Sequence, residues 1–226
     1  MFEFGLGTGD GGIWHARMAP HHLSPAQLVE EELIKAAAGN ELRRARLIIS
    51  HPVDPAGLGD RHSLHEGCTA WQLALLHGHT EMTALLREAG HGTPDPELEF
   101  LGACMRADRA EVDRLRAADP GILARAIARR PWQLCTAADE DRLDAVMLLT
   151  ELGFDVNATT RYPHQQAALH GAAFRGDLAM VKYLIDHGAD PGVEDCSYHA
   201  TPLGWAEHFH HQAVAEYLSG LTTPHP

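Results

Sequence analysis

Histidine is the residue type that stands out for its chemistry, with 17 copies in 226 residues. One group, His62, His65 and Cys68, shares a predicted loop at spacings that metal ligands use. A metal site needs three or four converging ligands with further groups to hold them, and the spacing here matches no strict zinc motif. The sequence therefore predicts no metal and no cofactor, and leaves this group as a weak alternative. A second group near the C-terminal end has the same interpretation: His208, His210 and His211.

General acid–base chemistry has its best candidates in the adjacent carboxylates Asp139 and Glu140. Such catalysis needs a carboxyl group whose pKa is shifted towards the working pH, as burial near His170 or His208 would achieve. Adjacent acidic residues before a helical turn are more typical of a solvated edge. The sequence also lacks a G-x-S-x-G motif or another recognisable nucleophile. We therefore predict no catalytic residue; in an enzyme, Asp139, Glu140 and His208 would carry the chemistry.

A repeating unit positions these side chains, and it is clearest in QAALHGAAFRGDLAMVKYLIDHGADP, residues 166–191. The pattern predicts a helix over 169–174, a turn at 175–177 and a second helix over 178–186 that ends at Gly188. Two short helices cannot bury their apolar face alone, so neighbouring units must stack on them. An alanine that marks the register recurs once in each of six units: Ala36, Ala74, Ala103, Ala137, Ala172 and Ala206.

This unit resembles the ankyrin-repeat family, whose T-P-L-H-x-A-A, G-H and V-x-x-L-L-x-x-G-A-D elements are visible in LHGAAFRGD, LIDHGAD, TPLGWA and TAWQLALLHGH. The resemblance is strong over 62–92 and 127–221 and moderate over 28–57 and 96–125. It implies an all-α solenoid of stacked helix pairs with short finger hairpins, of bacterial type and with about six repeats. His170 matches the motif histidine, which implies that its hydrogen bond orders the turn before the helix.

The domain boundaries follow from the repeats. We expect residues 1–25 to form a flexible glycine-rich arm, or an arm that packs its aromatic side chains on the first repeat. Residues 26–221 are then the repeat domain and residues 222–226 a tail. The middle is expected to be irregular, because the third unit is short and residues 121–131 predict an extra helical turn. The approximate repeats are 28–57, 62–92, 96–125, 127–157, 163–190 and 198–221.

Composition and charge exclude several classes of function. The net charge of −13 and the lack of a continuous basic patch argue against a nucleic-acid partner. No stretch of about 18 uncharged apolar residues is present, so we expect no contact with a membrane. The N-terminal sequence lacks a secretory pattern. The four cysteines show no C-x-x-C pairing, and Cys104 and Cys135 fit small buried positions, which favours a reducing, cytoplasmic location.

The family resemblance also implies which side chains face a concave groove and which lie on the fingers. Phe174 and Phe209 are expected to be exposed groove residues that, beside Arg175, form an interface hot spot. The alternative is that the two rings pack against each other between neighbouring first helices. The implied groove positions are Leu76, His77, Met105, Arg106, Asp139, Glu140, Phe174, Arg175, His208 and Phe209. The implied finger positions are His65, Glu66, Tyr162, His164, Ser197 and Tyr198.

Our main hypothesis is a module for protein–protein interaction that binds a protein partner through the groove and fingers of repeats 4–6. An alternative is a small-molecule-binding protein or enzyme with a groove pocket lined by His, Asp, Glu and Trp132. A third is self-association through an end repeat closed by Val214, Tyr217 and Leu218. The predicted binding residues are Trp132, Asp139, Glu140, Tyr162, His164, Phe174, Arg175, Tyr198, His208 and Phe209.

Overall fold

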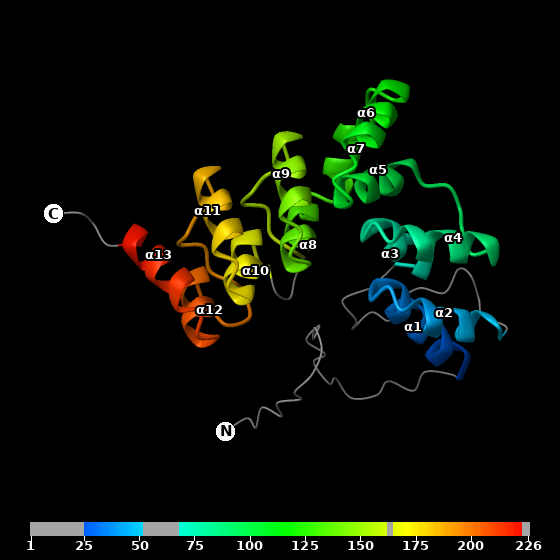
Figure 1. Ribbon diagram of the computed structural model, residues 1–226, viewed down its shortest axis with the longest axis horizontal. Helices are drawn as coiled ribbons and strands as arrows, with labels where there is room; N and C mark the ends of the chain where they lie inside the picture. The colour runs from blue at the N-terminus through cyan, green and yellow to red at the C-terminus, as the bar shows by residue number, and fades with distance from the viewer. Residues whose placement is uncertain (1–24, 52–67, 162–164, 223–226) are drawn as a thin grey trace.

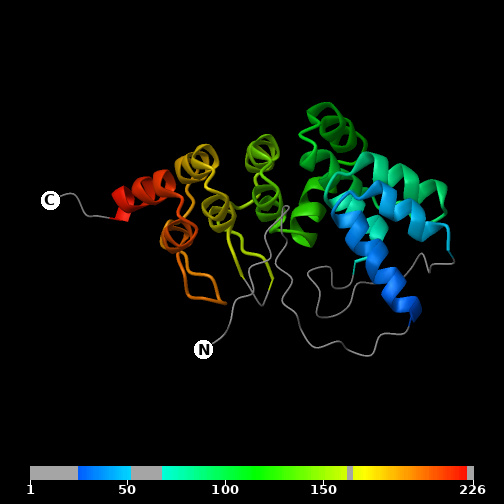
Figure 2. The same ribbon diagram turned by 60° about the horizontal axis from the view of Figure 1, so that its bottom comes forward.

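The computed structural model describes residues 25–51, 68–161 and 165–222, and these residues form thirteen α-helices. Twelve of the helices form six pairs, and Figures 1 and 2 show the pairs side by side in a curved stack. The expected all-α solenoid is therefore confirmed. The first helices of the pairs are α1 (Pro25–Ala38), α3 (Ala70–Leu76), α5 (Pro96–Met105), α8 (Gln133–Asp139), α10 (Ala168–Arg175) and α12 (Pro202–His208).

The second helices are slightly longer on average in the C-terminal repeats. They are α2 (Leu42–Ile49), α4 (Thr80–Glu88), α6 (Arg109–Ala118), α9 (Leu143–Glu151), α11 (Leu178–Asp186) and α13 (Gln212–Thr222). One helix stands outside the pairs: α7 (Ile122–Arg129) lies where the sequence predicted an extra helical turn. The described ranges contain no strand, only an isolated antiparallel bridge between Thr159 and Ala167.

Local sequence sets where the helices begin. The Thr69 hydroxyl accepts a hydrogen bond from the Gln72 backbone N–H, and the Gln72 side chain accepts one from the Thr69 N–H, which makes a capping box at the start of α3. Asp177 accepts hydrogen bonds from two backbone N–H groups of α11. Each cap satisfies helix donors that would otherwise have no partner.

The turn between the two helices of each pair has the same backbone conformation in all six repeats. Its residue has a positive φ between 52° and 74°, in the left-handed region. Glycine is the residue type that adopts this region without strain, yet it occupies only two of the six positions. The six residues are Asn40, Gly78, Ala107, Asp141, Gly176 and His210. The recurrence establishes six units from the backbone alone.

The core runs along the stack because small residues let the first helices approach closely. All six register alanines are fully buried, at 0% exposure. Gly102 in α5 shows how close the approach is, since a Cβ at this position would lie 2.5 Å from the Leu75 carbonyl oxygen of α3. Larger side chains of the second helices, such as Leu86, Leu149 and Leu184, fill the space between repeats.

Side chains at the start of several second helices reach back to the preceding repeat. The Nε2–H of His79 donates to the Ala38 carbonyl at 2.9 Å, and that of His211 donates to the Phe174 carbonyl at 2.7 Å. Arg142 donates in the same way to the Met105 carbonyl at 3.2 Å. Each acceptor lies at the C-terminal end of a first helix, where carbonyls lack intrahelical partners. Part of the histidine content is therefore structural.

The regular stacking of first helices is interrupted at α7. This helix packs on α5 and is held there by ion pairs from Arg125 to Glu97 (2.7 Å) and from Arg129 to Asp95 (2.7 Å). The main neighbours of α5 are α3 and α7, whereas those of α8 are α9 and α10. The row of first helices thus has a discontinuity between α5 and α8, visible in Figure 2. We call α1 to α7 the N-terminal section and α8 to α13 the C-terminal section.

None of the helices in the described ranges is long and apolar enough to cross a bilayer.

Candidate functional site

Four aromatic residues of repeats 5 and 6 form a cluster: Phe174, Tyr198, Trp205 and Phe209. The Phe174 ring from α10 meets the Phe209 ring edge to face at a centroid distance of 4.6 Å and the Trp205 ring at 5.9 Å. Trp205 in turn stacks on Phe209 and contacts Tyr198, each at 5.9 Å. His208 adds an edge contact to Phe209 at 4.8 Å. The cluster brings together the first helices and the last finger.

Burial in this cluster corrects one expectation. Phe174 and Phe209 are half-buried rather than exposed, because they pack against each other between neighbouring first helices. The alternative that the sequence left open is the arrangement found. The exposed aromatic residue of the cluster is Tyr198, at 62%, and His208 beside Phe209 is exposed as well.

A buried carboxylate fixes the finger that carries Tyr198. Asp195 accepts hydrogen bonds from the Trp205 indole N–H (2.8 Å) and from the backbone N–H groups of Ser197 (2.8 Å) and Tyr198 (2.7 Å). Burial opposes the ionisation of Asp195, but these donors outweigh it and hold its pKa below the ordinary value. The finger is therefore preorganised, and Tyr198 is presented on a rigid support.

His170 has the structural role that the family pattern implied. The Ala167 backbone N–H donates to His170 Nδ1 at 3.2 Å, and Nε2–H donates to the Ala200 carbonyl of the next finger at 3.1 Å. Burial lowers the pKa of this histidine, so the neutral ring is the form that the fold requires. His170 thus joins repeat 5 to repeat 6.

Asp139 lies at the end of α8 and is solvent-exposed. Its carboxylate lies over the backbone of Gly171 in α10, where a Cβ would come within 2.3 Å of Oδ1. Its pKa is raised to about 7, with desolvation as the largest cause; Arg175 lowers the pKa and Glu140 raises it. Because the group remains open to solvent, we attach no catalytic role to this shift.

Glu140 has a different environment, at the boundary between the two sections. Its Oε1 pairs with Nδ1 of His77 at the end of α3, and its Oε2 forms an ion pair with Arg142 at 2.8 Å. The buried side chain of Gln133 donates to the Leu76 carbonyl at 2.9 Å. These contacts connect repeat 2 directly to repeat 4, and we call His77, Gln133 and Glu140 the clasp.

Two further groove expectations are wrong. Leu76 is 3% exposed and Met105 is 2% exposed, so both belong to the core. The family pattern placed them in the groove by register, but in these repeats the close approach of α3 and α5 covers them. Arg106, next to Met105, is exposed.

Trp132 precedes α8 and is half-buried between two guanidinium groups. Arg161 lies 4.5 Å and Arg130 5.6 Å from the centre of its ring. Arg130 also donates to the Cys68 sulfur at 3.0 Å. Trp132 therefore has structural partners on the finger side of repeat 4. The predicted residues Tyr162 and His164 lie outside the described residues, as do His62, His65 and Glu66.

The histidines of the last repeat do not converge. His211 bonds the Phe174 carbonyl, and the ring of His208 lies against Phe209. Across the residues that the structure describes, no group of three or more His, Cys, Asp or Glu side chains could hold a metal ion. No hydrogen bond or ion pair in that part of the chain joins His208 to Asp139 or Glu140.

All four cysteines are free thiols. Cys104 and Cys135 are buried as predicted, and burial raises the pKa of Cys104 to about 12.

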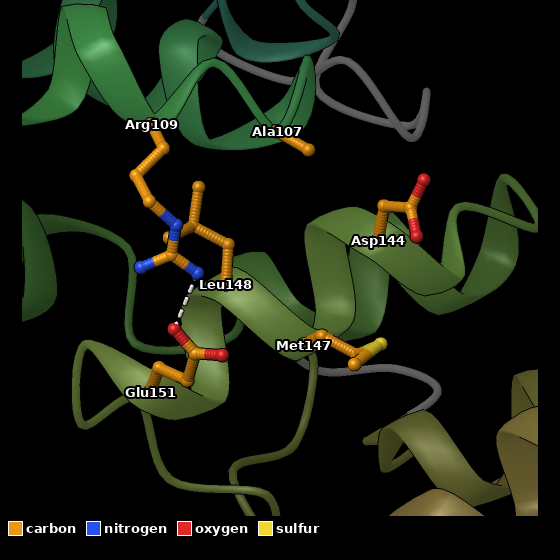
Figure 3. A pocket seen from close by; sticks show the side chains of 6 residues that line it. All are labelled: Ala107, Arg109, Asp144, Met147, Leu148 and Glu151. Carbon is orange, nitrogen blue, oxygen red and sulfur yellow. Dashed lines mark hydrogen bonds and ion pairs between the residues drawn. The ribbon is translucent and has the colours of Figure 1, made fainter.

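Two open hollows in the described residues lie away from the predicted pocket. One, of about 260 Å³, opens between the start of α6 and α9; Figure 3 shows Arg109 paired with Glu151 across it, beside Met147. The other, of about 280 Å³, is lined by residues of α12 and α13, among them Glu207 and His210. Both are open to solvent, and neither contains Trp132, Asp139, Glu140 or His208.

Charge differs strongly along the stack. Residues 134–222 carry 13 acidic and 4 basic side chains, a net charge of −9. Residues 25–133 carry 16 acidic and 13 basic side chains, a net charge of −3. The aromatic cluster therefore lies in the section that holds most of the negative charge.

The comparisons with known proteins agree with this geometry. The family described as "Ankyrin repeats (3 copies)" matches residues 134–223, which is the C-terminal section. Over 168 residues the chain is 33% identical to the B-cell lymphoma 3 protein homolog of Mus musculus, covering 70% of this chain and 35% of that protein. Over 188 residues it is 34% identical to the human B-cell lymphoma 3 protein, covering 79% and 38%.

The chain contains ankyrin repeats, which the family's model matches over residues 134–223. It spans a little over a third of the length of the curated relatives that it matches. The repeats and these relatives together support a module for protein–protein interaction.

Sequence reasoning missed two features of the site, the role of Asp195 and the clasp. Asp195 was not recognised as the organiser of the last finger, although an Asp side chain that accepts from the backbone N–H two residues on is a common turn pattern. The clasp was missed because His77 and Glu140 are 63 residues apart and belong to repeats that are not adjacent in sequence. Gln133, the third residue of the clasp, was missed because no sequence pattern in α8 indicates that its glutamine is buried.

Proposed function

We propose that this chain is a protein-interaction module that holds a basic, extended segment of a protein partner along the groove and fingers of repeats 4–6. The observation that carries the proposal is Tyr198, exposed above the Phe174–Trp205–Phe209 cluster and fixed by Asp195. A rigid exposed tyrosine over a packed aromatic base is the kind of residue that dominates interface energetics.

Charge supports the choice of a basic partner. The net charge of −9 over residues 134–222 attracts cations and raises their rate of association. Asp139 and Glu207 are exposed carboxylates of this section. Arg175 is an exposed cation among them and would favour a partner segment that also offers a carboxylate or carbonyl.

The remaining predicted residues take graded roles in this proposal. Tyr198 is the main anchor, and His208 extends its surface along α12. Phe174 and Phe209 support the anchor from below, since both are half-buried. Trp132, with Arg161, extends the surface towards repeat 4, where Tyr162 and His164 would also contribute.

The test is affinity capture from a lysate of the source organism with three full-length proteins: wild type, Tyr198→Ser and Met147→Ser. Met147 is an exposed apolar residue of α9 in the hollow of Figure 3, away from the aromatic cluster, and makes a matched control. We expect a protein that wild type and Met147→Ser retain, that Tyr198→Ser loses, and that about 0.5 M salt releases.

Thermal unfolding of all three proteins shows whether the fold is intact. The double variant Phe174→Ala with Phe209→Ala is less suitable, because removing two packed rings lowers stability as well. Equal retention by Tyr198→Ser and wild type would refute the binding surface. Retention that salt leaves unchanged would refute the basic character of the partner.

A further inference from the structure

The two ends of the stack differ in the side chains that they expose. On α13, the exposed residues are mostly polar or small: Gln212, Ala213, Glu216, Ser219, Gly220 and Leu221. On the first repeat, Leu28 is 51% exposed and Leu47 is 67% exposed. A terminal repeat needs a polar outer face to be stable in water. The C-terminal end meets this requirement better than the N-terminal end does.

Leu28 and Leu47 lie on one face of the first repeat. Leu28 is one helical turn before Glu32 in α1, and Leu47 is one turn after Arg44 in α2. Glu32 and Arg44 form an ion pair between the two helices, and Glu32 also pairs with Lys35 at 3.1 Å. Both leucines therefore lie next to the Glu32–Arg44 ion pair, on the side where α1 begins and α2 ends. We call this surface the end face.

The end face is attached covalently to the segment that precedes α1 in the sequence. Residues 1–24 join α1 at Pro25, three residues before Leu28, and contain Phe2, Phe4, Ile13 and Trp14. Three residues of helix rise by about 4.5 Å, while 24 residues can span up to about 80 Å. The tether therefore gives these apolar side chains a high effective concentration at the end face.

We propose that residues 1–24 dock on the end face and cover Leu28 and Leu47 with their aromatic side chains. The occupant is a segment of the same chain because it is attached three residues before Leu28 and contains apolar side chains that can cover the two exposed leucines. This contact is independent of the surface proposed for partner binding, which lies at the other end of the stack.

Trypsin provides a direct test, because Arg17 is the only lysine or arginine within residues 1–24. Three full-length proteins are compared: wild type, Leu28→Ser with Leu47→Ser, and Leu221→Ser as the control at the opposite end. Cleavage after Arg17 follows the fraction of molecules with the segment undocked, so we expect it to be about tenfold faster in the double variant. Leu221→Ser should cleave at the wild-type rate.

A reciprocal variant keeps the test valid if the double variant loses stability. Phe4→Ser with Trp14→Ser leaves the end face intact and should raise amide exchange in α1 and α2 without changing it in α10 to α13. Equal cleavage rates in wild type and Leu28→Ser/Leu47→Ser, or unchanged exchange in the reciprocal variant, would overturn the proposal. A third result would also overturn the proposal: protection of Arg17 from trypsin that is lost on dilution while the molar mass of the protein in solution halves. In that case a second copy of the chain would cover the end face.

Discussion

The two sections of the molecule use the same unit but join their units differently. In the C-terminal section, α8, α10 and α12 stack directly, and His170 connects one repeat to the next finger. In the N-terminal section, α7 takes the place of a finger, and α5 packs on α7 rather than on α8. The family match begins at residue 134, which is where the regular stack begins.

This difference shows what an irregular insertion demands of a solenoid. Where first helices stack, small side chains and dispersion contacts hold the repeats together. Where the stack is interrupted, polar side chains bridge the gap, as His77, Gln133 and Glu140 do between repeats 2 and 4. We infer that the clasp couples two sections that would otherwise unfold separately, as one-dimensional repeat arrays can.

The largest effect is expected from Gly102→Ala. The new Cβ would lie 2.5 Å from a backbone carbonyl, so α3 and α5 must separate, and the free energy of unfolding should fall by about 3 kcal/mol. Gly171→Ala in the C-terminal section is the matched control. It meets only the movable carboxylate of Asp139, so the gain in helix propensity should leave its stability close to wild type. Urea titration measures both, and an equal loss in the two variants would contradict the difference between the sections.

The next effect concerns the clasp. Gln133→Ala leaves the Leu76 carbonyl without its donor and should lower stability by about 2 kcal/mol. The exposed Gln212, bonded to Glu216, provides a control in which Gln212→Ala changes stability by less than about 0.5 kcal/mol. Unfolding followed by circular dichroism should also become less cooperative in Gln133→Ala. A free energy of unfolding of Gln133→Ala equal to that of wild type would show that the clasp does not stabilise the fold.

A smaller effect is expected at the histidines that cap a preceding helix. His79→Ala and His211→Ala each remove one hydrogen bond to a first-helix carbonyl and should cost about 1 kcal/mol. His187→Ala is the control, because this exposed histidine bonds the carbonyl of Tyr183 in its own helix. Thermal unfolding separates the three, and a loss in His187→Ala as large as in the other two would refute a repeat-to-repeat role.

The smallest effect is on the pH dependence. Burial holds the pKa of His170 and His79 below the ordinary 6.5, so the unfolded chain binds protons near pH 6 that the fold does not. Stability should therefore fall as the pH drops below 6.5. His170→Gln, which copies the capping Gln72 of repeat 2, should show a smaller fall between pH 7.5 and 5.5. Asp139 acts in the opposite direction, since its raised pKa adds stability as the pH falls through about 7. Urea unfolding curves of wild type and His170→Gln at pH 7.5 and 5.5 test whether stability falls with pH as expected.

The sequence predicted the regular parts of the fold because their signals are local. The register alanines, the cap at Gly188 and the hydrogen bonds of His170 depend on residues within one or two repeats. The extra helix at α7 was also predicted, since residues 121–131 had a helical pattern that no finger shows. Left-handed turns at Ala107 and His210 were not foreseeable, because the fold imposes this conformation against residue preference.

The candidate site was predicted less well. Of the residues named from the family register, Asp139, Arg175 and Tyr198 are exposed, in the part where the stack is regular, and their role in binding stays a prediction. At Leu76 and Met105 the register failed, because local helix packing in the irregular section decides which side chain is covered. Exposure of Phe174 and Phe209 was misjudged for a similar reason: contact between neighbouring first helices is a tertiary property.

The most direct test of the two-section account is hydrogen exchange of each helix across a urea titration of the full chain. The account predicts that α1 to α7 lose protection together and α8 to α13 lose it together at a different urea concentration. It also predicts that Glu140→Gln, which removes the charge that pairs with His77, moves these two concentrations further apart. Loss of protection in all thirteen helices at one urea concentration, unchanged by Glu140→Gln, would contradict the account.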